Sequence, residues 1–134
     1  MDDLYREIIL DYYKSPRNFG RLDYPTHSCE LNNPLCGDQI RMEVKIQRSK
    51  GSNLPAQAGI QIIEKIKFSG QGCAISMASA SMLTEKVIGR ETGYLHALTK
   101  DDIVKMLGIK LTPTRLKCAL LGLEVLQKAI RGEN

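Results

Sequence analysis

The stretch GDQIRMEVKIQ, residues 37–47, alternates apolar and polar side chains and therefore predicts a half-buried β-strand. Its apolar set is Ile40, Met42, Val44 and Ile46, and its polar set is Arg41, Glu43, Lys45 and Gln47. After a polar connection at 48–59, the stretch IQIIEKIKF, residues 60–68, resumes this β character. We expect the two stretches to pair antiparallel, with HSCELNN, residues 27–33, as a candidate third strand.

A helical pattern precedes these strands. Asp2 or Asp3 can cap a first helix that ends at Ser15-Pro16, and its apolar positions at four-residue spacing are Leu4, Ile8 and Tyr12. The segment PRNFGRLDYP, residues 16–25, is rich in Pro, Asn and Gly and predicts a loop.

Helical patterns also follow the strands. The run from Cys73 to Gly89 is rich in Ala, Ser, Met and Leu, which predicts a helix. A last helix has Thr112 as its cap and Pro113 in its first position, and its apolar stripe is Ala119, Leu123, Leu126 and Ile130. A helix, then strands, then helices is the order of an α+β fold.

Length and composition predict one domain, 1–134, with an ordinary globular balance of 43% apolar and 25% charged residues. No stretch approaches the roughly 18 apolar residues of a membrane span, and the amino terminus, MDDLYRE, is acidic where a signal peptide would be basic. We therefore expect a cytoplasmic protein with no membrane partner. The 19 basic residues are scattered, which argues against nucleic acid, and an acidic protein partner would explain the net charge of +4 equally well.

The four cysteines, Cys29, Cys36, Cys73 and Cys118, are spread along the chain, and no CxxC motif occurs. In a reducing cytosol, separated thiols are more often buried, reactive or metal-bound than paired in disulfides. A metal site would therefore have to be assembled by the fold from distant segments.

Three of these cysteines lie in stretches whose neighbouring residues are compatible with metal binding or a reactive thiol. In NPLCGD, residues 33–38, Cys36 and Asp38 flank Gly37 on a turn, either as a small apolar residue beside a solvated carboxylate or as two arms of a metal site. Cys73 follows Gly70 and Gly72, which keep its approach free of side chains.

As the first residue of a predicted helix, Cys73 would be favoured as the thiolate, although a buried thiol in a tightly packed helix is the alternative. Arg115 and Lys117 precede Cys118, and in an exposed site they would lower its thiol pKa.

Taken in order, the three stretches resemble the cysteine motifs of the IscU/SufU/NifU-type iron-sulfur cluster assembly scaffolds. The matching segments are NPLCGD at 33–38, GQGCAISMASASM at 70–82 and RLKCALLGLEVL at 115–126, and SPRNFG at 15–20 is similar to the family's loop after its first helix. The resemblance covers essentially the whole chain. It implies a three-stranded antiparallel sheet with helices packed against it, and a shared site of Cys36, Asp38, Cys73 and Cys118.

Three thiolates and a carboxylate suit either tetrahedral Zn²⁺ or a [2Fe-2S] cluster. The resemblance implies a scaffold, not itself an enzyme, that holds a transient [2Fe-2S] cluster and that binds Zn²⁺ in its apo form. Its expected partners are a cysteine desulfurase, an iron donor, recipient apo-proteins and a second copy of the chain. The alternative is a zinc-dependent, SufU-like sulfurtransferase, and in either role Cys36 and Cys118 are the candidate persulfide acceptors.

Departures from the motifs bear on that choice. The IscU branch has a His before the third cysteine, whereas this chain has Lys117, as the SufU branch typically does. The insertion that SufU-type proteins carry before that cysteine is, however, not seen. We prefer the scaffold for that reason. The segment 111–115 keeps only part of the chaperone-binding motif of the IscU branch, so dependence on a dedicated Hsp70 is not expected.

Other candidates receive plainer interpretations. Cys29 lies outside the motifs and is expected to be a core thiol. Neither His27 nor His96 is adjacent to a motif cysteine. A structural zinc module that binds nucleic acid fits least, because basic patches and stacking aromatic residues are lacking.

Overall fold

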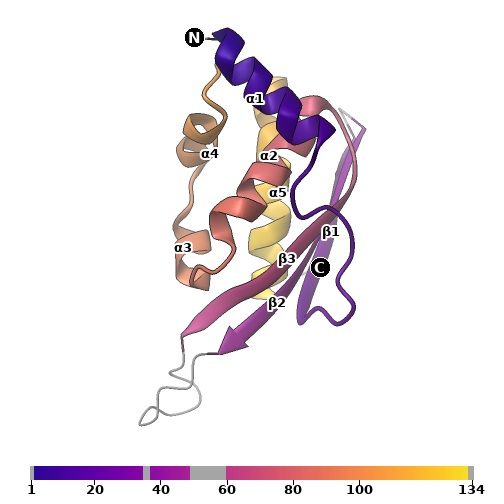
Figure 1. The fold of residues 1–134 in the computed structure, drawn as a ribbon, viewed down its shortest axis with the longest axis vertical. Coiled ribbons are helices and arrows are strands. Elements are labelled where there is room, and N and C mark those ends of the chain that lie inside the picture. The colour runs from indigo at the N-terminus through magenta and orange to yellow at the C-terminus, as the bar shows by residue number, and fades with distance from the viewer. Residues whose placement is uncertain (1, 35–36, 49–59, 133–134) are drawn as a thin grey trace.

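The computed structural model describes residues 2–34, 37–48 and 60–132 (Figure 1). The elements run in the order α1 (Asp2–Lys14), β1 (His27–Asn33), β2 (Asp38–Arg48), β3 (Gln61–Gln71), α2 (Ala74–Val87), α3 (Thr92–Ala97), α4 (Lys100–Leu107) and α5 (Pro113–Arg131). Among the described residues, no helix is both long and apolar enough to span a membrane.

The three strands form one antiparallel sheet in the order β1-β2-β3, as predicted. Met42 of β2 lies between Cys29 of β1 and Phe68 of β3 in the register. The alternation in β2 is confirmed, because Ile40, Met42 and Val44 are fully buried. A β-bulge between Lys45 and Ile46 shifts the register toward the far end of the β2–β3 pair.

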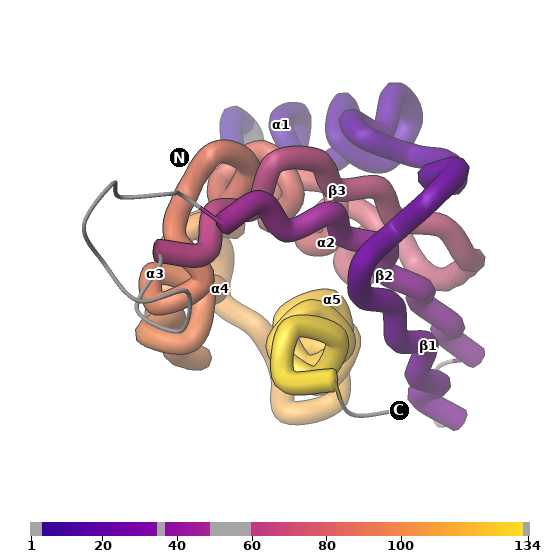
Figure 2. Tube along the Cα trace, turned by 90° about the horizontal axis from the view of Figure 1, so that it is seen from below, coloured from indigo at the N-terminus to yellow at the C-terminus, as the bar shows by residue number. Residues whose placement is uncertain are grey.

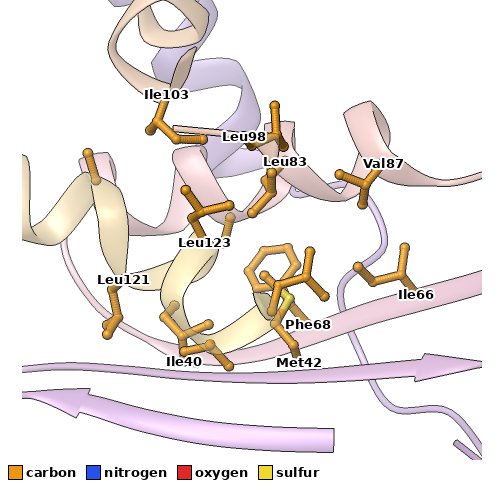
Figure 3. Close-up of a cluster of buried hydrophobic side chains, with 14 of the residues drawn as sticks. Ile40, Met42, Ile66, Phe68, Leu83, Val87, Leu98, Ile103, Leu121 and Leu123 are labelled. Atoms are coloured by element: carbon orange, nitrogen blue, oxygen red, sulfur yellow. The ribbon is translucent and has the colours of Figure 1, made fainter. Parts of the chain in front are cut away.

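The helices cover one face of the sheet. Helix α5 packs on β1 and β2, and α2 packs on α5 and β3. In the end-on view of Figure 2, α2 lies between α1 and α5. Figure 3 shows the core that results, in which Met42 and Phe68 of the strands face Leu83 of α2 and Leu123 of α5.

Small side chains let α2 approach α5 closely. Ser79 Oγ donates a hydrogen bond to the carbonyl oxygen of Ala119 at 2.7 Å, and both residues are buried. A Cβ added to Gly122 would lie 3.3 Å from Cα of Ala80, so glycine is the residue that fits this contact. The close packing expected from the Ala and Ser residues of α2 is therefore present.

The apolar stripe predicted for α1 is only partly correct. Leu4 is 62% exposed, and it is Ile9 that is buried. Tyr12 is half-buried and donates a hydrogen bond to Glu85 of α2 at 2.6 Å. The difference arises because α1 packs mainly on α2, and this contact buries only a narrow face of α1.

The loop predicted at 16–25 is part of a crossing segment, residues 15–26, that runs from α1 to β1 against the sheet. Asn18 accepts a hydrogen bond from the N–H of Phe68 at 2.9 Å, and Gly20 donates one to the Phe68 carbonyl at 2.8 Å. Farther along, the N–H of Thr26 donates to the Val44 carbonyl at 2.9 Å. These bonds attach the segment to β3 at one end and to β2 at the other.

Candidate metal site

The fold brings together three of the four predicted ligands. One ligand atom each from Asp38, Cys73 and Cys118 lies within 4.8 Å of the others. Asp38 is the first residue of β2, Cys73 directly precedes α2, and Cys118 lies in the second turn of α5. The fourth predicted ligand, Cys36, lies outside the described residues.

Asp38 is placed in the site by burial and by one hydrogen bond. Its exposed fraction is 1%, and its Oδ1 accepts the backbone N–H of Cys73 at 2.9 Å. Its Oδ2 is also buried and has no hydrogen-bond partner among the described residues. A buried carboxylate oxygen without a partner is costly, and a cation bound between Asp38 and the thiols would compensate for that cost.

Cys73 occupies the N-cap position of α2, as predicted, with φ −73° and ψ 169°. Its thiol lies 3.7 Å from Ser76 Oγ, and that hydroxyl donates a hydrogen bond to the Cys73 carbonyl at 3.0 Å. The residue is half-buried, whereas Asp38 and Cys118 are buried.

Glycine at position 72 makes room for the carboxylate. A Cβ there would lie 2.5 Å from Asp38 Oδ1 and would also overlap Ser76 Oγ. At Gly70, where φ is +132°, a Cβ would overlap the backbone of Gln39. The prediction that these glycines keep the approach to Cys73 free of side chains is consistent with this geometry.

The sequence leaves the exposure of Cys118 open, and the structure buries this residue. Cys118 is 1% exposed, whereas Arg115 and Lys117 are exposed. Consecutive helical residues point about 100° apart, so Lys117 can face solvent while Cys118 faces the interior. The thiol therefore belongs to the buried face of α5, one position before the predicted stripe.

Residues outside this set do not join it. Cys29 is 2% exposed and lies opposite Met42 in the sheet, which confirms that it is a core thiol. His27 Nδ1 lies 2.9 Å from Thr26 Oγ1, and His96 is exposed on α3. Asp38, Cys73 and Cys118 form the one such candidate group among the described residues.

A hollow of about 430 Å³ borders the amino-terminal end of α2. Ala74 and Ile75 of α2 line it together with Ile9 of α1, and its basic side chains are Arg6, Lys110 and Arg115. Ala74 directly follows Cys73 in the chain, but none of Asp38, Cys73 and Cys118 lines this hollow. The sequence did not predict this hollow, since Arg6 is about a hundred residues away in the chain from Lys110 and Arg115.

Comparisons with known proteins converge on one family. The family model for the NifU-like N-terminal domain matches residues 4–132. The zinc-dependent sulfurtransferase SufU of Bacillus subtilis is 35% identical over 150 residues, covering 99% of this chain and 93% of the relative. The iron-sulfur cluster assembly scaffold protein IscU of Aquifex aeolicus is 35% identical over 127 residues, covering 95% and 74%. A solved structure from Fervidobacterium islandicum, described as a candidate iron-sulfur cluster assembly scaffold for the SUF system, superposes with a TM-score of 0.71 at 25% identity, covering 92% and 94%.

Proposed function

We propose that this chain, which belongs to the NifU-like N-terminal domain family, is a scaffold on which [2Fe-2S] clusters are assembled and from which they pass to apo-proteins. In this role a cysteine desulfurase supplies sulfur as persulfide, an iron donor supplies ferrous iron, and a reductant such as excess thiol or a reduced ferredoxin supplies the remaining electrons that convert the persulfide sulfur to sulfide. The observation that carries the proposal is the buried Oδ2 of Asp38, which lacks a hydrogen-bond partner among the described residues and lies in one group with the thiols of Cys73 and Cys118.

The donor set suits the cargo. Thiolates hold the irons of [2Fe-2S] clusters, and a carboxylate is a harder ligand that binds iron less tenaciously. Asp38 is therefore the ligand at which a recipient thiol can most readily enter. We include Cys36 as the fourth ligand, because it stands two residues before Asp38 and only Gly37 lies between them.

The chain's own residues prepare this site. The N–H of Cys73 donates a hydrogen bond to Asp38 Oδ1 at 2.9 Å, which fixes the direction of the carboxylate, as hydrogen bonds to metal ligands commonly do. Asp38 and Cys118 are buried, and half-buried Cys73 is the most exposed of the three described residues of the site. Thiolate attack on a persulfide needs access, so the burial of Cys118 argues against it as the first sulfur acceptor, and Cys36 is the other candidate that the sequence offers.

The second candidate function is a zinc-dependent sulfurtransferase. Two or three thiolates with a carboxylate also make a tetrahedral Zn²⁺ site, and the relative from Bacillus subtilis bears that name at 35% identity. In this role Zn²⁺ holds the thiols until one is released to accept persulfide. Both functions use reduced thiols, so we expect the chain to work in a reducing compartment such as the cytoplasm.

Anaerobic reconstitution with ferrous iron, cysteine and a cysteine desulfurase separates the two functions. A scaffold should develop the visible absorbance of a [2Fe-2S] cluster and transfer it to an apo-ferredoxin. Asp38→Ala should hold the cluster longer and transfer it more slowly, by about tenfold for each ~1.4 kcal/mol added to the release barrier. Cys29→Ala is the matched control and should behave as the wild type.

Two results would count against the scaffold. One is a wild type that assembles no cluster yet accelerates desulfurase turnover, which would favour the sulfurtransferase. The other is full assembly in both Cys73→Ala and Cys118→Ala, which would mean that the site has been placed wrongly.

A further inference from the structure

The face of the sheet that the helices do not cover carries a lysine cluster, Lys45, Lys65 and Lys67. Lys45 of β2 and Lys65 of β3 lie directly opposite each other in the register, and Lys67 follows two residues along β3. Side chains at these positions share one face of the sheet, opposite to the face that carries buried Val44 and Ile66. Like charges placed directly opposite destabilise a strand pair, so the cluster is an unfavourable arrangement for the isolated chain.

A hollow of about 460 Å³ lies over this cluster. Its other wall is the crossing segment, which contributes Arg21, Leu22, Asp23 and Tyr24. Tyr24 is 87% exposed, and Asp23 is the one acidic residue in the lining. The lining therefore has four basic side chains and one carboxylate, and because Arg21 also pairs with Glu43, the three lysines carry the excess positive charge.

The neighbouring acidic residue Glu43 does not neutralise the lysines. Its carboxylate is already occupied by Arg21 at 3.1 Å and Arg41 at 3.2 Å, and its Oε1 accepts the N–H of Leu22 at 2.8 Å. Among the described residues, no carboxylate lies within ion-pair distance of a lysine of the cluster. The connection at 49–59, which joins β2 to β3, contains no Asp or Glu in its sequence.

We propose that this hollow is a docking surface for an extended acidic segment of a partner protein. Side chains two residues apart on a strand are separated by roughly 6.6 Å on one face, which is the spacing of Lys65 and Lys67. An extended partner segment with a carboxylate at every second residue repeats that distance. Its carboxylates would relieve the repulsion between Lys45 and Lys65, and Tyr24 offers an exposed aromatic ring beside them.

The docking surface is separate from the metal site. Lys45 stands seven residues after Asp38 on β2, which corresponds to about 23 Å along the strand. Odd-numbered and even-numbered residues of this part of β2 point to opposite faces, so Asp38 and Lys45 lie on different sides of the sheet. A partner held at the lysine cluster would leave the metal site open to a second protein, whatever cargo that site carries.

The test uses a labelled peptide of alternating Glu and Ser residues, with binding followed by fluorescence anisotropy at low salt and mapped by amide chemical shifts. We expect saturable binding that weakens as salt rises, with shifts centred on Lys45, Lys65 and Lys67. Lys65→Glu/Lys67→Glu should weaken binding by about tenfold or more, since each ion pair contributes a few-fold. Saturation with Zn²⁺ should leave the affinity unchanged.

Two double variants serve as controls. Lys100→Glu/Lys105→Glu changes the net charge equally, but on α4, and should bind as the wild type. Lys65→Arg/Lys67→Arg keeps the charge and should retain binding, and circular dichroism should show that every variant is folded.

Several outcomes would overturn the proposal. These are an absence of saturable binding at low salt, equal loss of binding in the α4 variant, or shifts centred on Arg6, Lys110 and Arg115 instead of the cluster. Tighter binding of a single-stranded oligonucleotide of matched charge would assign the surface to nucleic acid.

Discussion

Replacing Gly72 by alanine should damage the candidate metal site through a single added carbon atom. The new Cβ would lie 2.5 Å from Asp38 Oδ1 and 3.1 Å from Asp38 Cγ, and it would also overlap Ser76 Oγ. The Ser76 hydroxyl can rotate away, but the carboxylate is buried and held by the N–H of Cys73 at 2.9 Å. The carboxylate must therefore move, and its hydrogen bond must lengthen or break.

The size of the effect follows from these contacts. Overpacking of a filled interior costs about 1–3 kcal/mol, and loss of a hydrogen bond to a charged group costs about 1.5–3 kcal/mol. Because both costs come from one displacement, they overlap, and we expect the free energy of unfolding of the apo-protein to fall by about 2–3 kcal/mol. Misdirection of Asp38 should weaken Zn²⁺ binding by about 10- to 100-fold.

Urea unfolding of the metal-free protein measures the first effect, and competition with a chromophoric chelator measures the second. Gly93→Ala is the matched control, because Gly93 lies in α3 with no atom within 4 Å of an added Cβ. That change should leave Zn²⁺ affinity unaltered and stabilise the chain by up to about 1 kcal/mol. In an Asp38→Ala background, Gly72→Ala should cost much less, since the displaced group is gone. Wild-type stability and affinity in Gly72→Ala would refute the role given to this glycine.

Three further predictions concern residues outside the ligand set. Burial alone would raise the pKa of Glu43, but the N–H of Leu22 and two arginines outweigh it and lower that pKa. The stabilisation by ionised Glu43 is therefore complete above the pKa that this carboxyl has in the unfolded chain, and it is lost as pH falls through the pKa that it has in the folded protein. Glu43→Gln should cost about 1–3 kcal/mol at neutral pH and less below about pH 4, as measured by urea titrations. Cys29→Ala should cost about 1 kcal/mol by the same assay while leaving Zn²⁺ stoichiometry unchanged; a loss of bound metal would place Cys29 in the site. Tyr12→Phe should cost about 0.5–1 kcal/mol, and ultraviolet titration should lose one tyrosine with a raised pKa, which its hydrogen bond to Glu85 causes; an unchanged titration would contradict that origin.

The sheet could be predicted from the sequence because apolar and polar residues alternate clearly along its strands. Ile40, Met42 and Val44 alternate with polar residues, and a strand with one buried face has only one register that buries them all. The position of Cys73 could also be predicted, since glycines before it and small helix formers after it leave few other places for the helix to begin.

The short helices α3 and α4 carry weaker signals and were not predicted individually. Helix α4 has eight residues, and its start is fixed by a capping box between Thr99 and Asp102. The Thr99 N–H donates a hydrogen bond to the Asp102 carboxylate at 2.8 Å. This bond is the main cause of the lowered pKa of Asp102, and the hydrogen bond from the Thr99 side chain is the second. Such a box is visible in the sequence only once the helix is known to begin there.

Burial at the site could not be predicted from local sequence, because it depends on which helix covers which residue. The sequence around Asp38 fits a solvated carboxylate as well as it fits a metal ligand, yet Asp38 is 1% exposed. The exposure of Cys118, which follows Lys117, is left open by the sequence, yet the residue is 1% exposed. In both cases the deciding contact comes from an element more than thirty residues away in the chain.

These distant contacts tie the candidate metal site to the fold itself. The hydrogen bond between Cys73 and Asp38 joins the start of α2 to the start of β2, and Cys118 adds α5 to the same point. A metal bound there would cross-link three elements that the unfolded chain holds far apart, so its binding free energy adds to the stability of the fold. Conversely, the buried Oδ2 of Asp38, which has no hydrogen-bond partner among the described residues, weakens the metal-free form, so an empty site is unfavourable at equilibrium. The rate of transfer is a separate quantity: as a harder ligand than the thiolates, the same carboxylate lowers the barrier at which a recipient thiol enters.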